Sequence, residues 1–233
     1  MAVSTPVATA VDAVTVTDRV CLDVGAGHGD STAALLAADA ANVYSVDSDP
    51  GRVAALADRF DDRCTPILAD LRALPLGADS VDVCLAHAVC NQVTPAGLWT
   101  LATELARVAT ADATLVVDDY TPLPADAAVA DLFALEDATA CLATGAPAQT
   151  FYPPGLVAAV FEAHGWRPAG DRVLLDPVPW TGPHLDAHRG AIREGAATLV
   201  PTLHRGVTAA LDAVVSTSDR AGSMYSRRFT RRD

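Results

Sequence analysis

The chain has 233 residues, of which 51% are hydrophobic and 19% charged, with 29 acidic side chains against 16 basic ones and a formal net charge of −13. This length fits one domain whose core is large enough to fold without a metal or a disulfide. The negative charge disfavours binding to nucleic acid or to an anionic membrane surface, because both depend on clustered positive charge. No apolar run suits a transmembrane helix, and residues 1–16 lack the basic start of a secretory signal.

The charged residues come from a narrow set. All 16 basic side chains are Arg, and 25 of the 29 acidic ones are Asp. Hydrated carboxylates would keep such an acidic protein soluble in high salt. A GC-rich genome would give the same bias, because it favours the codons of Ala, Gly, Arg and Asp over those of Lys. Both explanations stay open.

The five cysteines contain no Cys-x-x-Cys pair. They are Cys21, Cys64, Cys84, Cys90 and Cys141. An odd number, with two of them inside apolar runs, is typical of reduced thiols in or near a core. We therefore expect a cytoplasmic protein without structural disulfides.

Short apolar runs alternate with helical patterns from residue 19 to about residue 120. Each run is nearly continuously apolar, which is typical of parallel strands that are buried on both faces and connected by helices. Asp49 before Pro50 and Thr94 before Pro95 are expected to cap two of the helices. The expected strands cover 19–24, 42–47, 64–69, 81–86 and 114–118, and the expected helices cover 30–40, 50–60 and 94–109.

The pattern changes after Tyr120. No repeat or low-complexity linker divides the chain, so the second half is expected to be a helical elaboration of the same domain. The final run, RRFTRRD, alternates arginines with other residues as a solvated edge strand does. A helix followed by a break is expected within 122–145. Further helices are expected over 153–165 and most of 183–216, with strands over 172–178 and 223–231.

A glycine-rich turn stands directly after the first expected strand and before the first helix of this series. It reads DVGAGHG, residues 23–29. Glycines leave the backbone open to a ligand, and the first amides of the helix point toward it. The dinucleotide fingerprint G-x-G-x-x-G would need a small third residue where this chain has Asp30, whose carboxylate would face a pyrophosphate. Asp23 at the strand end suits instead a cationic ligand group, such as an ammonium or a sulfonium.

Acidic residues also end the next two strands. Asp47 follows Gly25 by 22 residues and is placed to accept hydrogen bonds from ribose hydroxyls. Asp70, after the third strand, can accept from an exocyclic amine, and Leu71 can pack on a base. The sequence thus predicts a site for a nucleoside that carries a cationic group.

These motifs resemble those of the class I S-adenosylmethionine-dependent methyltransferases. The segments that carry the resemblance are VCLDVGAGHGDST, VYSVDSDP and ILADLRALPLGADSVDVCLAHAV, in that order. Residues 74–76 (LPL) followed by 79–82 (DSVD) are similar to the segment before the fourth strand in the small-molecule branch that includes quinone-biosynthesis methyltransferases. The resemblance is close over 19–120 and returns loosely at 152–167 and 222–225.

The resemblance implies an α/β fold: a Rossmann-like, doubly wound, seven-stranded and mostly parallel sheet with helices on both faces and a helical elaboration in the C-terminal half. It implies a single domain over 1–233. Within it, 1–18 would form an N-terminal helical cap, 19–120 the cofactor-binding half, and 121–233 the acceptor-site half with helical insertions.

It also implies S-adenosylmethionine as the cofactor. The glycine turn would let the backbone approach the methionine part, and Asp23 would help to hold its amino group. Asp47 would bind the ribose, Asp70 the adenine amine and Leu71 one face of the adenine. His28 departs from the pattern, because that position is more often small or Thr. The expected cofactor-binding set is Asp23, Gly25, Ala26, Gly27, Asp47, Ser48, Asp70, Leu71 and His87.

No catalytic residue follows from the motifs. Methyl transfer needs an aligned acceptor, exclusion of water and, for a hydroxyl acceptor, removal of a proton, so acid–base residues are optional. Asp118 and Asp119 are a close carboxylate pair, which can raise one pKa and produce a base, or else one caps a turn and the other is solvated. The residues at the carboxyl end of the sheet are His87, Asn91, Asp118, Asp119 and Tyr120, and the catalytic candidates among them are His87, Asp118, Asp119 and Tyr120.

Two other groups of side chains could form a ligand site. His184 and His188 are one helical turn apart, but no neighbouring Glu or Cys completes a ligand set, so no metal is expected. Phe151, Tyr152 and Trp180 either line an acceptor pocket or belong to the core.

We therefore expect a cytoplasmic enzyme that moves a methyl group from S-adenosylmethionine to a small molecule, aromatic or isoprenoid. Two alternatives stay open: a non-catalytic S-adenosylmethionine-binding protein, and an NAD-dependent oxidoreductase, which the glycine spacing disfavours. The expected partner is the small-molecule acceptor, with no nucleic acid and no membrane insertion. The run AHAV at 86–89 lacks the motif of DNA amino-methylation, and a homodimer is left open.

Overall fold

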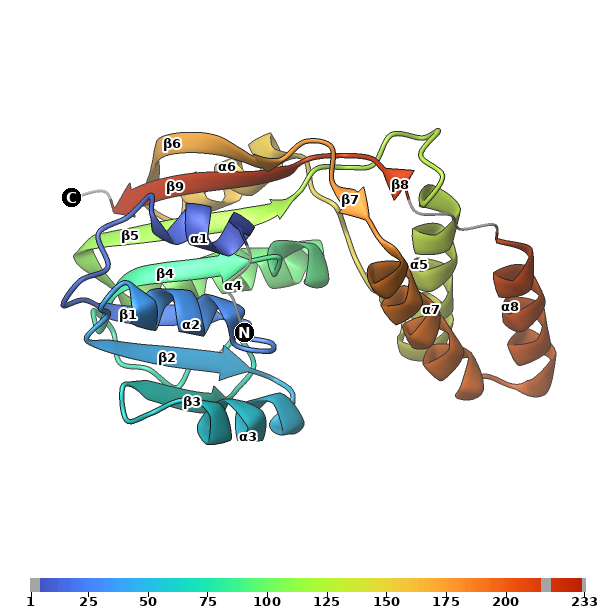
Figure 1. The fold of residues 1–233 in the computed structure, drawn as a ribbon, viewed down its shortest axis with the longest axis horizontal. Helices are drawn as coiled ribbons and strands as arrows, with labels where there is room; N and C mark the ends of the chain where they lie inside the picture. Colours follow the sequence, from blue (N-terminus) through green and yellow to red (C-terminus); the bar gives the residue numbers. More distant parts are fainter. Residues whose placement is uncertain (1–4, 215–218, 232–233) are drawn as a thin grey trace.

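The computed structural model describes residues 5–214 and 219–231. Within them the chain forms a seven-stranded sheet with helices on both faces (Figure 1). This is the doubly wound, mostly parallel α/β architecture that the sequence predicts. In sheet order the strands are β3 (Cys64–Leu68), β2 (Asn42–Asp47), β1 (Val20–Val24), β4 (Val81–His87), β5 (Ala109–Tyr120), β9 (Met224–Arg231) and β6 (Trp166–Leu175).

The order of the strands indicates where a ligand is expected to bind. Strands β1 to β5 pair in parallel, and β9 lies antiparallel between β5 and β6. From β1 the chain moves outward through β2 to β3, and it then returns to place β4 on the other side of β1. The winding direction therefore reverses between β1 and β4. In open α/β sheets, ligands bind at the carboxyl ends of the strands beside such a switch point.

Two layers of helices cover the sheet, because successive strand residues face opposite sides. In β4, Cys84 packs in the same hydrophobic cluster as the inner faces of α4 and α6. Its neighbour Leu85 packs with α1 and α2 on the other face. The helices are α1 (Thr5–Val11), α2 (Asp30–Ala37), α3 (Pro50–Arg59), α4 (Pro95–Val108), α5 (Ala130–Thr144), α6 (Pro154–Ala163), α7 (Gly182–Ala197) and α8 (Pro201–Ala213), with a short 3-10 turn η1 (Cys90–Gln92) before α4.

A helical lobe extends beyond the carboxyl ends of the parallel strands, at the right of Figure 1. Helices α5, α7 and α8 build it around a hydrophobic cluster of their own, together with the two-stranded sheet of β7 (Pro179–Trp180) and β8 (Asp219–Arg220). The rings of Phe133 and Trp180 meet at 5.0 Å near the middle of this cluster. The lobe is the helical elaboration expected after residue 120.

Both predicted helix caps are confirmed. The Asp49 carboxylate accepts the backbone amides of Gly51 and Arg52 at the start of α3. The Thr94 hydroxyl accepts the amide of Gly97 at the start of α4, at 3.2 Å. In each case a proline follows the cap, where its missing amide costs no hydrogen bond.

The last two strands of the sheet differ from the prediction. β6 begins at Trp166, six residues before the predicted start, and its register shifts between Pro168 and Gly170. Proline is tolerated on an edge strand, so the usual strand pattern is weak there. β9 is an interior strand rather than an edge, and its Arg227 pairs with Asp171 of β6 at 2.7 Å. Part of the predicted helical range 183–216 lies outside the described residues.

Among residues 5–214 and 219–231, none of the helices combines the length and the apolar character that a membrane span needs.

Candidate active site

A cleft of about 680 Å³ opens where the carboxyl ends of β1, β2 and β4 meet. Its volume lies within the range of small-molecule sites. The walls are the glycine turn, the end of β2, the segment after β3, and the segment that leads from β4 into α4. Eight residues of the predicted cofactor set line it: Gly25, Ala26, Gly27, Asp47, Ser48, Asp70, Leu71 and His87.

The glycine turn needs its glycines for two separate reasons. Gly25 has φ of 73°, and a Cβ there would lie 2.7 Å from Cγ2 of Val89, in the segment between β4 and α4. Gly29 has φ of 83°, and a Cβ there would lie 2.6 Å from Cδ2 of Leu56 in α3. Gly25 therefore keeps the cleft floor bare, whereas Gly29 lets the start of α2 pack on α3, a role that was not predicted.

Asp47 is held rigidly at the cleft wall. One carboxylate oxygen accepts the amide of Gly27 and the other accepts the amide of Asp49, both at 2.9 Å. Arg52 approaches the same carboxylate at 3.6 Å. Each carboxylate oxygen has a second lone pair, so Asp47 can still accept hydrogen bonds from the hydroxyls of a ligand.

Asp23 lies beneath the cleft rather than on its surface. It is 1% exposed, and its carboxylate accepts the hydroxyl of Thr32 in α2 at 2.6 Å. Burial raises the pKa of Asp23 to about 6, against the lowering effect of the Thr32 hydrogen bond. The negative charge of Asp23 can therefore act on a cationic ligand group only through space.

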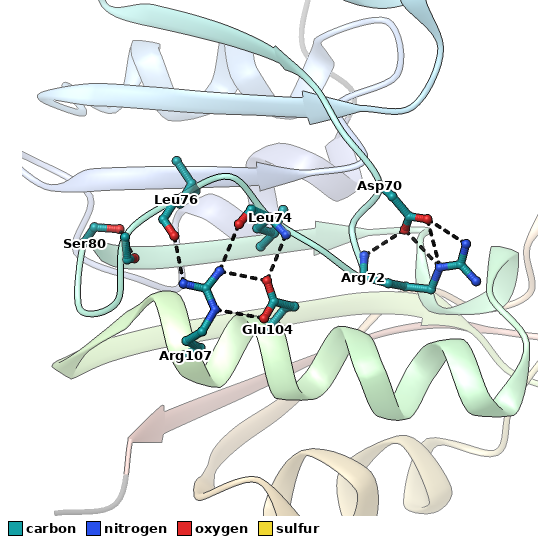
Figure 2. A network of polar contacts seen from close by, with 8 residues as sticks. Asp70, Arg72, Leu74, Leu76, Ser80, Glu104 and Arg107 are labelled. Carbon is teal, nitrogen blue, oxygen red and sulfur yellow. Dashed lines mark hydrogen bonds and ion pairs between the residues drawn. The ribbon is translucent and has the colours of Figure 1, made fainter.

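Asp70 is exposed and already has a partner. Arg72, two residues later, forms a bidentate ion pair with it, with the shortest contact at 2.6 Å (Figure 2). This hydrogen-bonded pair lowers the pKa of the Asp70 carboxyl. Arg72 also lines the cleft, so a ligand amine that reaches Asp70 shares the carboxylate with Arg72 or displaces it. The sequence did not predict this pairing.

The segment after Asp70 is fastened to α4, as Figure 2 shows. Arg107 donates to the carbonyls of Leu74 and Leu76 and pairs with Glu104 at 2.8 Å. Glu104 in turn accepts the amide of Leu74 at 2.8 Å. These contacts hold the LPL segment of the sequence motif in place beside the cleft.

His87, the last residue of β4, contacts a buried acid. Its Nδ1 lies 2.9 Å from Oδ2 of Asp118, which is its register partner on β5. Asp118 has no exposed surface, whereas the His87 side chain is 20% exposed and lines the cleft. The structure thus joins two of the four predicted catalytic candidates.

Asp118 and Asp119 serve different partners, because adjacent strand residues point to opposite faces. Asp119 accepts the amides of Asn91 and Tyr120, at 2.9 and 2.7 Å. Burial raises its pKa to about 6. Although the two carboxylates are neighbours in the sequence, each one therefore has its own hydrogen-bond partners.

The aromatic candidates of the second half are packing residues. Tyr120 and Phe151 join the aromatic cluster of the helical lobe, with ring centroids 6.1 Å apart. Trp180 is buried and donates to the carbonyl of Ala221, and buried Tyr152 donates to the carbonyl of Val93. Of the two readings left open for these side chains, the core role fits the structure.

The histidine pair of α7 meets an acid from another helix. His188 lies 2.8 Å from Glu136 of α5, a neighbour that is far away in the sequence. His184 instead approaches the Thr181 hydroxyl at 3.3 Å. Within the described parts of the chain, no three His, Cys, Asp or Glu side chains converge as a metal site would require.

The hydrogen-bond acceptors and the apolar side chain that line the cleft fit S-adenosylmethionine. Carboxylate acceptors at Asp47 and Asp70 suit ribose hydroxyls and an adenine amine, and Leu71 supplies an apolar face. Asp30 lines the same cleft near the glycine turn, where it would repel the pyrophosphate of a dinucleotide. A sulfonium or ammonium group has no such conflict.

Comparison with known proteins agrees with this geometry. Residues 21–112 match the family model of a methyltransferase domain. This segment contains β2 to β4, all of β1 except Val20, and every lining residue named above. The match covers the strands and loops that build the cleft, and it does not extend over the second half of the chain. A search of curated protein sequences finds no match to this chain.

Solved structures share the fold of this chain at low sequence identity. A protein from Bacillus halodurans named as a methyltransferase has a TM-score of 0.68 at 11% identity, covering 97% of this chain and 99% of the other. The 1,6-didemethyltoxoflavin-N1-methyltransferase of Burkholderia thailandensis, solved with 1,6-didemethyltoxoflavin and S-adenosylhomocysteine, gives 0.61 at 15%, covering 98% and 77%. The [4+2]-cyclase SpnF gives 0.66 at 16%, covering 97% and 79%.

Proposed function

We propose that this protein is a class I S-adenosylmethionine-dependent methyltransferase that transfers the methyl group of S-adenosylmethionine to a small-molecule acceptor. The observation that carries the proposal is the cleft, which joins the bare glycine turn to the fixed carboxylate of Asp47 and to the Asp70–Leu71 corner. The similarity of residues 74–82 to the quinone-biosynthesis branch favours an aromatic or isoprenoid acceptor.

The roles of the residues follow from their chemistry. The glycine turn would hold the methionine part, Asp47 the ribose, and Asp70 with Leu71 the adenine. When bound, S-adenosylmethionine supplies an electrophilic methyl group on a positively charged sulfur. The protein's own task is to hold the acceptor in line with that group, to exclude water and to deal with the acceptor's proton.

A small acceptor is favoured by the charge and by the fold neighbours. The formal charge of −13 opposes the approach of a nucleic acid. The Burkholderia neighbour was solved with a small molecule beside S-adenosylhomocysteine. SpnF, which shares the fold, is named for a cyclisation rather than a methyl transfer, so the test has to detect transfer itself and not only binding.

Two measurements test the proposal. Calorimetry should show binding of S-adenosylmethionine and S-adenosylhomocysteine but not of NAD; tight NAD binding without a response to the sulfonium ligand would contradict the cofactor assignment. Incubation with methyl-labelled S-adenosylmethionine and a metabolite extract should then give a labelled small molecule. Binding without any labelled product would favour the alternative of a non-catalytic S-adenosylmethionine-binding protein.

A further inference from the structure

The contact between His87 and Asp118 has the features of a proton-accepting pair. Asp118 has no exposed surface, and its Oδ2 lies 2.9 Å from Nδ1 of His87. Its other oxygen, Oδ1, is buried without a hydrogen-bond partner among the described residues. Burying an ionised carboxylate in this way is costly unless an opposite charge can form beside it. His87 is the contacting group that can carry that charge.

The pairing fixes which nitrogen of His87 is free. An ionised carboxylate can only accept hydrogen bonds, so Nδ1 of a neutral His87 carries the proton that it donates to Asp118. Nε2 is then left with a bare lone pair. His87 lines the cleft and is partly exposed, so a bound ligand can contact the side chain that carries this lone pair. A proton taken up at Nε2 would give an imidazolium that Asp118 stabilises.

The backbone beside His87 supports a built site. Ala88 has φ of 54°, in the left-handed region that residues other than glycine rarely adopt. Its amide donates to the carbonyl of Asp118, and its carbonyl accepts the side-chain amide of Gln92, both at 2.8 Å. Strained residues that are held in this way concentrate at functional sites. The turn sets the direction in which β4 ends, and therefore the position of the His87 ring.

We propose that His87, held by Asp118, is the proton acceptor of the reaction and that the methyl acceptor is a hydroxyl group on a small molecule. The inference rests on the proposed methyl-transfer function. The acceptor oxygen forms a bond to the methyl carbon while the bond from that carbon to sulfur breaks. The electron pair of the broken bond stays on sulfur, which becomes a neutral thioether, and the hydroxyl proton moves to Nε2 of His87.

The pair favours a hydroxyl over an amine for a chemical reason. A hydroxyl is a weak nucleophile until its proton is removed, so a base at the reacting atom speeds the transfer. An amine reacts through the lone pair of its neutral nitrogen and loses its proton afterwards, so it does not need a base at the moment of transfer. A buried carboxylate in contact with a histidine of the cleft therefore assists methylation of a hydroxyl, whereas methylation of an amine does not need it.

The first test measures the tautomer of His87. The full chain, labelled with ¹⁵N-histidine and saturated with S-adenosylhomocysteine, is compared with its Asp118→Asn and His164→Gln variants by NMR. We expect neutral wild-type His87 to carry its proton on Nδ1, Asp118→Asn to shift the proton toward Nε2, and His164→Gln to change nothing at His87. A proton on Nε2 in the wild type, or no effect of Asp118→Asn, would overturn the proposal.

The second test identifies the methylated atom. Metabolite extract is incubated with S-adenosylmethionine carrying a ¹³C-methyl group, and the product methyl carbon is classified by NMR. We expect a methoxy carbon, and we expect His87→Gln to lower product formation at saturating cofactor by about 10²–10⁴-fold, with His164→Gln as the control. An N-methyl product, or a His87→Gln loss confined to S-adenosylhomocysteine affinity, would overturn the inference and leave methyl transfer standing. The absence of any labelled product would contradict the proposed function itself.

Discussion

The carboxylate of Asp47, at the end of β2, accepts the backbone amide of Gly27 in the turn after β1, at 2.9 Å. This bond ties the two neighbouring strand ends together before any ligand binds. Since the second oxygen is fixed by the amide of Asp49, the carboxylate has one orientation and presents its remaining lone pairs in the cleft.

Replacing Asp47 by Ala should weaken binding of S-adenosylhomocysteine by about 1–3 kcal/mol, or roughly 5- to 150-fold in Kd, through loss of charge-assisted hydrogen bonds. Calorimetry measures this directly. The matched control is Asp58→Ala on the exposed face of α3, which should bind as the wild type does. Equal affinity in the wild type and in Asp47→Ala would mean that the ribose lies elsewhere.

Gly25→Ala should destabilise the protein by roughly 2–4 kcal/mol, because the new Cβ is strained at φ of 73° and meets Val89 at 2.7 Å. Adding Val89→Ala should recover the part that is due to the clash but not the part that is due to φ. Thermal unfolding separates the two parts. Gly77→Ala, where a Cβ meets no atom within 4 Å, is the control and should be close to neutral. A neutral Gly25→Ala would contradict the geometry of the turn.

The buried acids Asp23 and Asp119 should make stability fall as pH rises from about 4 to 7. The folded pKa of each is about 6 against an ordinary value of 3.8. Each therefore binds its proton more tightly in the folded protein, and the stability that this gives is lost as pH rises through the folded pKa.

Asp23→Asn keeps an acceptor for Thr32 and removes the buried charge. It should raise the free energy of unfolding at pH 7.5, on the order of 2–3 kcal/mol, and leave it unchanged near pH 4, where Asp23 is already protonated. Urea unfolding at several pH values gives the comparison. Exposed Asp58→Asn is the control, and a gain that is equal at both pH values would show that the charge is not its source.

Arg107→Ala should loosen the segment that follows Asp70. Arg107 holds two carbonyls of this segment and pairs with Glu104, so its loss leaves the Glu104 carboxylate without its cationic partner. We expect a loss of about 1–3 kcal/mol in stability and faster hydrogen exchange at the amide of Leu74. Exposed Arg63→Ala should stay within about 0.5 kcal/mol of the wild type. Unchanged exchange at Leu74 would mean that α4 does not fix the segment.

The sequence by itself predicted the architecture and most of the residues that line the cleft. Apolar strands, the glycine turn and the caps at Asp49 and Thr94 are local signals, because each depends on residues that are close in the chain. The same holds for Asp47 and Asp70, which stand at strand ends that the topology brings to one edge. The net charge of −13, with its 25 Asp, restricted the class of partner.

Tertiary structure alone decided the polar pairs around the cleft. His87 meets Asp118 only because β4 and β5 pair in a particular register, although 31 positions separate them. Asp119 faces the other side of the same strand, so two carboxylates that are adjacent in the sequence have separate hydrogen-bond partners. Arg107 reaches Leu76, in the segment after Asp70, from a position 31 residues later in the chain. Such contacts depend on register and packing between elements that are distant in the chain, so local sequence patterns do not predict them.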